Sequence, residues 1–248
     1  MLKYYDRAWN PVFGCHGGFA GCDKCYAREQ MLKRGFCDDF GKVEINRKQL
    51  ERKFDKSVRE LICICTQSDL FQDGARQELA DRVLRICDDN PQNRYMTLTK
   101  FTRNLMDYMS GQGVRERLSR NGMKTASLEN VCFGTTICVP DDLHRLDELK
   151  NTPLIKHRFI SFEPLLDDVA KYMDARFLDG FDWVIAGAET GNGRSRCPAE
   201  WLEGIVELAD QAGLPVFVNA VDLGDRLAIE PDEKPPMLRR SEIPYAVK

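Results

Sequence analysis

The sequence of 248 residues lacks the features that would place it in a membrane or in a secretory pathway. It has no apolar run near the roughly 20 residues that are needed to cross a bilayer. Its N-terminal segment, "MLKYYDRAWN", has no apolar stretch of the kind that a signal peptide carries. We therefore expect a soluble, cytoplasmic protein with no membrane partner.

The chain also lacks a large excess of either charge. It has 36 Lys and Arg residues against 39 Asp and Glu residues, which gives a formal net charge of −3. Because non-specific affinity for nucleic acid comes mainly from cations that neutralise phosphates, this balance argues against a generally cationic nucleic-acid binder. One segment, residues 94–124, is locally basic, and its cations are Arg94, Lys100, Arg103, Arg115, Arg117, Arg120 and Lys124. A solvated helix face is the simpler interpretation of this run, and a local nucleic-acid surface is the alternative.

No internal repeat or low-complexity tract appears before residue 226. Instead, short apolar runs that predict strands alternate with longer amphipathic runs that predict helices. We expect strands at 61–68, 94–100, 131–137, 158–164, 182–190 and 215–221, and helices at 75–89, 102–111, 141–151 and 198–213. This order predicts an α/β fold with a parallel sheet, and six or seven such units fit a full or partial (β/α) TIM-type barrel better than the alternative, a doubly wound open sheet. We expect one barrel domain over 1–225 and a C-terminal extension over 226–248.

Polar side chains stand where the predicted strands end. Active sites of parallel barrels gather at the C-terminal ends of the strands, so we expect these side chains to share one face. They are Ser68, Asp69, Thr99, Lys100, Thr135, Thr136, Glu163, Glu189, Thr190 and Asn219. Any one of them is also explained as a cap or turn residue, but the series as a whole indicates a site.

Ten cysteines in a chain without a signal peptide indicate a reducing compartment rather than a disulfide scaffold. Cys63, Cys65, Cys87 and Cys132 lie in apolar runs or on a helical face, where free cysteine packs as a small hydrophobe. Cys138 and Cys197 fall near the ends of predicted elements, so we leave open that one of them approaches the site.

The remaining thiols of interest, Cys15, Cys22 and Cys25, form a C-x6-C-x2-C pattern in the glycine-rich stretch "NPVFGCHGGFAGCDKCYA". Glycine tolerates positive φ, so such a loop can wrap closely round a metal centre. Structural zinc sites generally have four ligands in two knuckles, and a second knuckle is missing here. His16 adjoins Cys15 too closely to complete a tetrahedral site easily. A catalytic cysteine would leave two thiols unexplained, and no His/Asp arrangement is visible.

Three thiolates fit a [4Fe–4S] cluster that leaves one iron open for a small molecule. S-adenosylmethionine is the candidate, because its amino and carboxylate groups bind an iron and its sulfonium accepts an electron. Homolysis would then release a 5′-deoxyadenosyl radical, which a barrel mouth would hold away from solvent.

The block "WNPVFGCHGGFAGCDKCYA" resembles the opening of a phage- and bacteria-borne family related to radical S-adenosylmethionine enzymes. "TQSDLFQDG", "TLTK", "FGTTI", "ISFEPLL" and "DWVIAGAETGNGRSRCPAEWL" resemble its later blocks in the same order, over roughly residues 8–220. The Ser-Asp, Thr-Lys and Glu-Pro blocks are more distantly similar to spore photoproduct lyase, a radical enzyme that repairs DNA. The loop departs from the commonest C-x3-C-x2-C spacing, and "FVNAVDLGD" stands where the family has a Lys-Gln-Trp-Gly-like block.

The resemblance implies a radical S-adenosylmethionine barrel with Cys15, Cys22 and Cys25 as cluster ligands. We assign Ser68 and Asp69 to the methionine amino group or the ribose, and Lys100 to the methionine carboxylate. Thr99 belongs to the same cofactor-binding face. Thr135, Glu163 and Glu189 are left for ribose, substrate or proton transfer. Tyr26 is expected to pack on the adenine, with ordinary core packing as the alternative.

The preferred hypothesis is a radical enzyme that abstracts hydrogen from a nucleic-acid base or nucleotide, supplied with electrons by a reductant such as flavodoxin or ferredoxin. The enzymatic alternative is radical modification of a peptide, an amino acid or another small metabolite. The non-enzymatic alternative is a metal-stabilised module that binds DNA or RNA, which would hold zinc and leave S-adenosylmethionine intact. Affinity that falls steeply with salt would favour a nucleic-acid partner.

Overall fold

A computed structural model describes residues 4–74, 77–111, 114–120, 122–123, 128–191 and 193–245, without the side chain of Arg115. Seven strands form one parallel sheet. They are β1 (Arg7–Trp9), β4 (Leu61–Ile64), β5 (Arg94–Thr99), β6 (Val131–Thr136), β7 (His157–Phe162), β8 (Trp183–Ala186) and β9 (Val216–Val218). Two short antiparallel pairs lie outside this sheet, formed by β2 (Val12–Phe13) with β3 (Glu44–Ile45) and by β10 (Val221–Asp222) with β11 (Leu227–Ala228).

Helices connect most of the strands. The α-helices are α1 (Tyr26–Lys33), α2 (Arg47–Leu50), α3 (Gln77–Asp88), α4 (Thr102–Ser110), α5 (Val114–Arg120), α6 (His144–Lys150) and α7 (Ala199–Gln211). Short 3-10 turns are η1 (Pro140–Leu143), η2 (Val169–Tyr172), η3 (Ala175–Leu178), η4 (Pro231–Glu233) and η5 (Pro236–Leu238). The expected helix at 141–151 begins as the 3-10 turn η1 and becomes α-helical only at His144, because Pro140 and two acidic residues favour a tight first turn. No described helix is both long enough and apolar enough to span a membrane.

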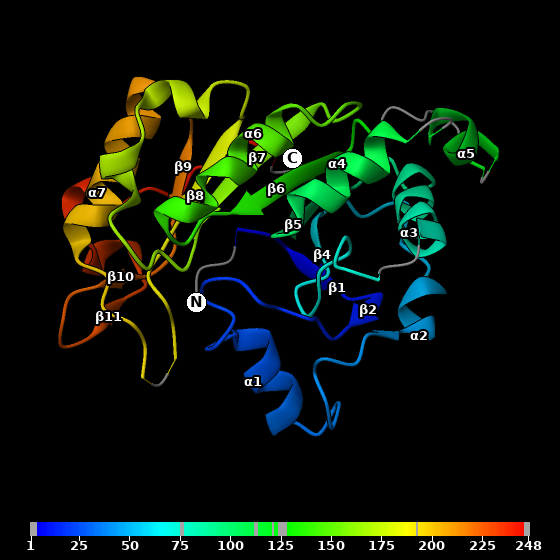
Figure 1. The fold of residues 1–248 in the computed structure, drawn as a ribbon, viewed down its shortest axis with the longest axis horizontal. Coiled ribbons are helices and arrows are strands. Elements are labelled where there is room, and N and C mark those ends of the chain that lie inside the picture. The colour runs from blue at the N-terminus through cyan, green and yellow to red at the C-terminus, as the bar shows by residue number, and fades with distance from the viewer. Residues whose placement is uncertain are drawn as a thin grey trace.

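The order of strands in the sheet is β1-β4-β5-β6-β7-β8-β9, and every neighbouring pair is parallel. Because the order follows the chain without reversal, each crossover moves one position in the same direction, as in a barrel and unlike a doubly wound sheet. Figure 1 shows the strands as an arch, with α3, α4, α6 and α7 outside it and the segment that carries α1 across its open side. The expected partial barrel is confirmed as a half-barrel of seven strands.

Side chains alternate between the two faces of the sheet and build two cores. The outer core, between the sheet and the helices, includes Ile62, Phe133 and Val184. The inner core, on the concave face, includes Cys63, Phe159 and other residues at alternate positions, namely Leu61, Met96, Cys132, Trp183, Ile185 and Phe217. The expectation that Cys63, Cys65, Cys87 and Cys132 are core residues is confirmed, since all four are buried.

The first and last described segments of the chain pack against the inner core. Tyr4 and Tyr5 from the start of the chain, and Ile243 and Tyr245 from its end, pack on the inner core. Residues 240–242 also cover the free edge of β9: Val218 N–H donates to Arg240 O and Glu242 N–H donates to Val216 O. In parallel barrels the site lies at the C-terminal ends of the strands, so that end of the concave face is the place to look for one.

Candidate functional site

The three cysteines of the C-x6-C-x2-C motif lie on one loop between β2 and α1, at the C-terminal end of the sheet. Cys15, Cys22 and Cys25 are free thiols and all three are partly exposed. Gly17 has a φ of 66°, and a Cβ there would lie 3.5 Å from Cβ of Cys22, so the loop folds back closely on itself. Burial raises the pKa of the Cys15 thiol to about 11, with smaller raising effects from the charges of Asp69, Cys22 and Cys25 and an opposing hydrogen bond from the backbone of Gly17.

The first part of this loop is fixed to the end of β4. Ser68 Oγ donates to the carbonyl of Gly14 at 2.5 Å, and Gln72 Nε2 donates to the same oxygen at 3.1 Å. The Gln72 side chain also accepts a hydrogen bond from His16 N–H at 3.0 Å. Only glycine fits at position 14, because a Cβ there would lie 2.4 Å from the carbonyl oxygen of Lys42. These bonds hold Cys15 beside the sheet.

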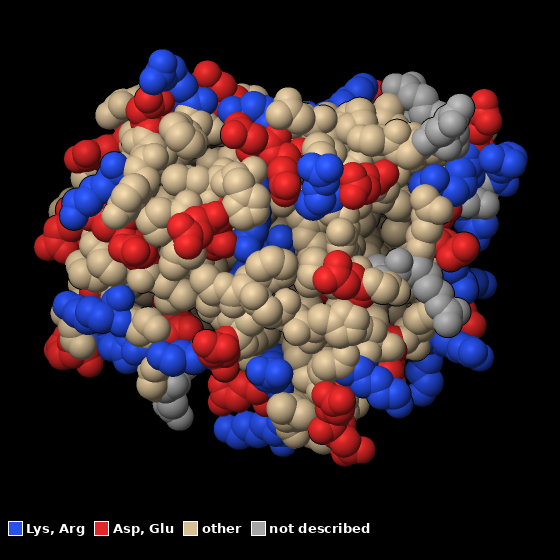
Figure 2. Space-filling model, in the orientation of Figure 1, with Lys and Arg blue, Asp and Glu red and all other residues tan. Residues whose placement is uncertain are grey.

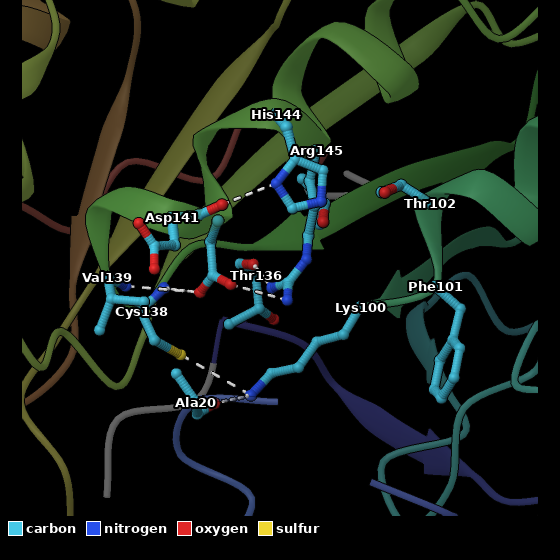
Figure 3. A network of polar contacts seen from close by, with 12 residues as sticks. Ala20, Lys100, Phe101, Thr102, Thr136, Cys138, Val139, Asp141, His144 and Arg145 are labelled. Carbon is cyan, nitrogen blue, oxygen red and sulfur yellow. Dashed lines mark hydrogen bonds and ion pairs between the residues drawn. The ribbon is translucent and has the colours of Figure 1, made fainter. Parts of the chain in front are cut away.

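The middle of the loop rests on the ends of β5 and β6 (Figure 3). Lys100 Nζ donates to the carbonyl of Ala20 at 2.6 Å and lies 3.7 Å from Sγ of Cys138. Next to Ala20, the ring of Phe19 packs edge-on against Phe101, with 4.8 Å between ring centroids. Lys100 therefore points into the mouth of the half-barrel, where the sequence predicts a site residue, and its ammonium group contacts the cysteine loop directly.

A buried ion pair supports this part of the mouth. Arg145 and Asp142 lie 2.7 Å apart, and Asp142 Oδ2 accepts a hydrogen bond from Cys138 N–H at 2.8 Å. The guanidinium also stacks over the ring of Phe19 at 4.6 Å and donates to the carbonyl of Thr136. Figure 3 shows Arg145 of α6 reaching toward Thr136, the last residue of β6. Burial raises the pKa of the Cys138 thiol to about 11. Of the two cysteines left open by the sequence, Cys138 is the one beside the loop.

The far end of the loop is attached to the segment after β8. Lys24, which lies inside the cysteine motif, donates to Gly193 O at 2.7 Å and to Ser195 Oγ at 3.1 Å. Its ammonium lies 3.6 Å from Glu189 Oε2, and the same oxygen accepts a hydrogen bond from Ser195 N–H at 2.6 Å. The loop thus crosses the mouth from β4 to β8, and the predicted residue Glu189 lies beneath its far end.

Asp69, Thr99 and Thr135 tie neighbouring strand ends together. The buried Asp69 carboxylate accepts hydrogen bonds from Thr99 Oγ1 and from the N–H groups of Lys100 and Phe71. Burial raises its pKa and these bonds oppose the rise. Thr135 Oγ1 donates to the carbonyl of Thr99 at 2.9 Å. All three side chains are satisfied by the protein itself.

Glu163 and Asn219 meet on the other side of the mouth, after β7 and β9. Asn219 Nδ2 donates to Glu163 Oε1 at 2.6 Å. Burial raises the pKa of Glu163 to about 7, against the lowering effects of the Asn219 hydrogen bond and of the Lys234 charge. Lys234 is buried and donates to the carbonyl of Val218 at 2.7 Å. Sequence analysis missed Lys234, since nothing in the charged tail distinguishes it from a surface lysine.

Other residues that the sequence singled out take no part in the contacts described above. Tyr26 opens α1 and is 60% exposed, so its contact with an adenine stays a prediction. In the basic segment, Arg117 pairs with the buried Asp81 at 2.9 Å, and Arg94 Nη1 donates a hydrogen bond to the backbone carbonyl of Glu129. Lys124 and the side chain of Arg115 lie outside the described residues. Figure 2 shows acidic and basic side chains interspersed on the visible face, without a broad patch of one sign.

The cysteine loop carries three free thiols, the donor set that a [4Fe–4S] cluster with one open iron would need. No three His, Cys, Asp or Glu side chains among the described residues gather closely enough to hold one metal ion. Thiolates round one zinc, each about 2.3 Å from the metal, must lie within about 4 Å of one another. A [4Fe–4S] cluster binds each thiolate to a different iron and so accepts a wider spacing. Cys25 is also the N-cap residue of α1, where the helix dipole favours an anionic group.

Comparisons with known proteins give a family and a fold. The model of a family described as "Protein of unknown function (DUF5131)" matches residues 1–224. No curated protein matches the chain. Among solved structures, a cysteine-to-serine mutant of spore photoproduct lyase is similar at 12% identity with a TM-score of 0.50, covering 85% of this chain and 75% of that one. A double mutant of that lyase with bound AdoMet and dinucleoside spore photoproduct is similar at 12% identity with a TM-score of 0.45, covering 82% and 61%. At this identity the first likeness shows a shared fold.

Proposed function

The chain belongs to the family described as "Protein of unknown function (DUF5131)", and we propose that this member is a radical S-adenosylmethionine enzyme. The observation that carries the proposal is the placement of three free cysteines on one loop across the C-terminal mouth of a parallel half-barrel. The loop is bonded to Ser68, Lys100 and the segment after β8, so it crosses the end of the sheet at which barrel enzymes hold their substrates.

In this proposal, Cys15, Cys22 and Cys25 hold a [4Fe–4S] cluster and no fourth protein ligand is needed. When bound, the cluster supplies an electron that cleaves S-adenosylmethionine to methionine and a 5′-deoxyadenosyl radical. The electron comes from a reductant such as flavodoxin or ferredoxin. The loop's own contacts supply rigidity: Lys24, Lys100 and Ser68 each donate a hydrogen bond to it or to its far anchor.

The polar side chains of the mouth divide into two groups. The Lys100 ammonium group has three N–H donors, and one of them is used by the carbonyl of Ala20. We propose that the remaining donors bind the methionine carboxylate. Asp69 accepts a hydrogen bond from the backbone of Lys100, so we assign it the positioning of that lysine together with Thr99. Ser68 and Thr135 hold the loop and the β5 end, respectively. These assignments make Ser68, Asp69, Thr99 and Thr135 supports of the cofactor site rather than direct ligands.

Two carboxylates are left to face the substrate. Glu163 is partly exposed in the mouth and has a pKa near neutrality, which suits a group that exchanges a proton at physiological pH. Glu189 pairs with Lys24 and lies under the loop end. We propose a nucleic-acid base or nucleotide as the substrate, on the resemblance of the Ser-Asp, Thr-Lys and Glu-Pro blocks to spore photoproduct lyase. A peptide, amino acid or small metabolite is the rival substrate class.

The test of the reaction type is an anaerobic assay. The full chain is reconstituted with iron and sulfide, reduced with dithionite and incubated with S-adenosylmethionine, and 5′-deoxyadenosine is quantified. Single variants Cys15→Ala, Cys22→Ala and Cys25→Ala are compared with Cys197→Ala, a buried cysteine away from the loop. We expect each loop variant to lose the product and most of its iron, while Cys197→Ala retains both.

Two outcomes would contradict the proposal. A protein that takes up zinc in place of iron and sulfide would indicate a metal-stabilised binding module. A reduced cluster that leaves S-adenosylmethionine intact would remove the radical reaction. The substrate class is tested separately, because binding of an oligonucleotide through phosphate contacts must weaken steeply as salt rises, whereas binding of a neutral metabolite must not.

A further inference from the structure

The pair of Glu163 and Asn219 is the part of the mouth whose hydrogen-bonding capacity is least used. Inward-facing positions alternate along β7 and β9, and these two residues continue the inward series of Ser161 and Phe217 just past the strand ends. Asn219 is 5% exposed and Glu163 is partly exposed. The pair therefore forms part of the wall of the mouth, with the carboxylate nearer to its opening.

Two acceptor atoms in this pair have no hydrogen-bond partner in the described part of the chain. Asn219 Nδ2 is used by Glu163 Oε1, but Asn219 Oδ1 is buried and unpartnered. The second carboxylate oxygen, Glu163 Oε2, also has no hydrogen bond to a described residue. A buried acceptor left without a partner costs about 1–3 kcal/mol, so Asn219 Oδ1 calls for an explanation, whereas Glu163 Oε2 belongs to a partly exposed side chain. A ligand that brings N–H donors would supply one.

The pair is held firmly enough to select a ligand. On one side Asn219 bonds the carboxylate, and on another the backbone of Gly187 passes so close that a Cβ there would lie 3.2 Å from Glu163 Oε1. The cysteine loop lies directly next to this wall, since a Cβ on Gly21 would lie 3.2 Å from the ring of Pro164, the residue after Glu163. A ligand on this pair is therefore next to the loop that carries the three thiols.

The charge around the pair favours a neutral ligand. Lys234 is buried and donates to the carbonyl of Val218, the residue before Asn219; its charge acts on Glu163, as the charge of Glu163 acts on Lys234. The two opposite charges compensate each other, so a cationic ammonium or guanidinium ligand would add an excess positive charge to a buried place. The charge of Glu163 also acts on Tyr4 and Tyr5, whose raised pKa, caused mainly by burial, keeps both phenols neutral. The complementary ligand is a neutral group with two neighbouring N–H donors.

We propose that Oε2 of Glu163 and Oδ1 of Asn219 form a binding site for the edge of a guanine-type base. Such a base presents a ring N–H and an exocyclic amino group side by side, one donor for each acceptor, and reading of this edge is usual for enzymes that take a base out of its stack. The inference deepens the proposed function by naming its substrate class, and it rests on that function only for the reaction that the bound base undergoes. Binding itself is independent of the cluster chemistry.

The test uses guanosine 5′-monophosphate and inosine 5′-monophosphate, which differ only in the exocyclic amino group. Their dissociation constants for the full chain are measured by calorimetry, so that contributions of phosphate and ribose cancel in the ratio. We expect the guanine nucleotide to bind about tenfold more tightly, the effect of one hydrogen bond to a charged or buried acceptor. In Glu163→Gln an amide N–H₂ takes the place of Oε2 while the bond to Asn219 is kept. We expect this variant to lose guanine binding by about tenfold or more.

Controls separate this site from the cofactor site and from misfolding. Glu200→Gln, an exposed change on the outer helix α7, should leave both nucleotides unaffected. Asn219→Ala provides a second variant, and circular dichroism shows whether either variant is folded. Equal affinity of the wild-type chain for the two nucleotides would overturn the inference. The inference would also fail if Glu163→Gln weakened the binding of S-adenosylmethionine instead, because the two acceptors would then bind the cofactor's adenine. Tighter binding of the cation agmatine than of either nucleotide would likewise contradict it.

The two proposals fail in different ways. Preferential guanine binding without any 5′-deoxyadenosine would retain the base site and remove the radical reaction. Formation of 5′-deoxyadenosine without preference for guanine would retain the reaction and remove the base site.

Discussion

Glu163 should make the protein less stable as the pH rises, and the isosteric change Glu163→Gln should remove this effect. The folded-state pKa is about 7, whereas the ordinary value is 4.5. Below the ordinary value the side chain is protonated in both states and contributes no penalty. Between the two values the unfolded chain releases the proton and the folded chain retains it, so stability falls as the pH rises. Above about 7 both states are ionised and the penalty is complete.

The magnitude follows from the difference of 2.5 between 7 and 4.5. At about 1.36 kcal/mol for each pKa unit the full penalty is about 3 kcal/mol, of which about 2.5 kcal/mol develops between about pH 5 and about pH 8. The variant keeps an acceptor for Asn219 Nδ2, so the hydrogen bond at 2.6 Å need not be lost. The variant should therefore gain stability relative to the wild-type chain by about 2.5 kcal/mol over this pH range.

The assay is urea unfolding of both chains, followed by circular dichroism under reducing conditions at a series of pH values. The quantity of interest is the difference in unfolding free energy between the two chains at each pH, because titration of all other groups cancels in it. A difference that does not change with pH would refute the buried, proton-retaining state of Glu163. A difference that changes in favour of the wild-type chain at high pH would show that the pKa is lowered instead.

Two further predictions concern residues that sequence analysis did not single out. In Lys234→Met the loss of the cation should raise the pKa of Glu163 further. The pH above which the stability difference between the Glu163→Gln variant and its parent chain stops growing should therefore be higher in the Lys234→Met background. An unchanged pH would contradict an effect of the Lys234 charge on Glu163. In Gly134→Ala the added Cβ would lie 2.3 Å from the ring of Phe159, so we expect a loss of about 3 kcal/mol and a lower Tm, whereas Gly111→Ala, whose Cβ would meet nothing closer than 3.6 Å, should change Tm little.

Much of the fold was predictable because it depends on local patterns. Apolar runs of four to six residues alternating with amphipathic helices already define a parallel sheet, and the strands at Leu61–Ile64, Arg94–Thr99 and Val131–Thr136 lie within the expected ranges. The start of the sheet was less visible, since β1 ends at Trp9 and the short β2 intervenes before the cysteine loop. A strand of three residues has too few positions to show a period.

The sequence by itself determined the alternation of strands and helices, which predicted a full or partial barrel. It also determined the cysteine motif and the polar residues at the strand ends, because strand ends and loop spacing are properties of consecutive residues. Only the tertiary structure decided what these residues contact. It brought Lys24 to Glu189 and Lys100 to Ala20 and Cys138, over separations of 38 to 165 residues in the chain. It also brought Lys234 from the tail near enough to Glu163 for its charge to lower the pKa of that carboxyl group. Burial, hydrogen-bond partners and pKa depend on neighbours from distant segments, and no local pattern specifies those neighbours.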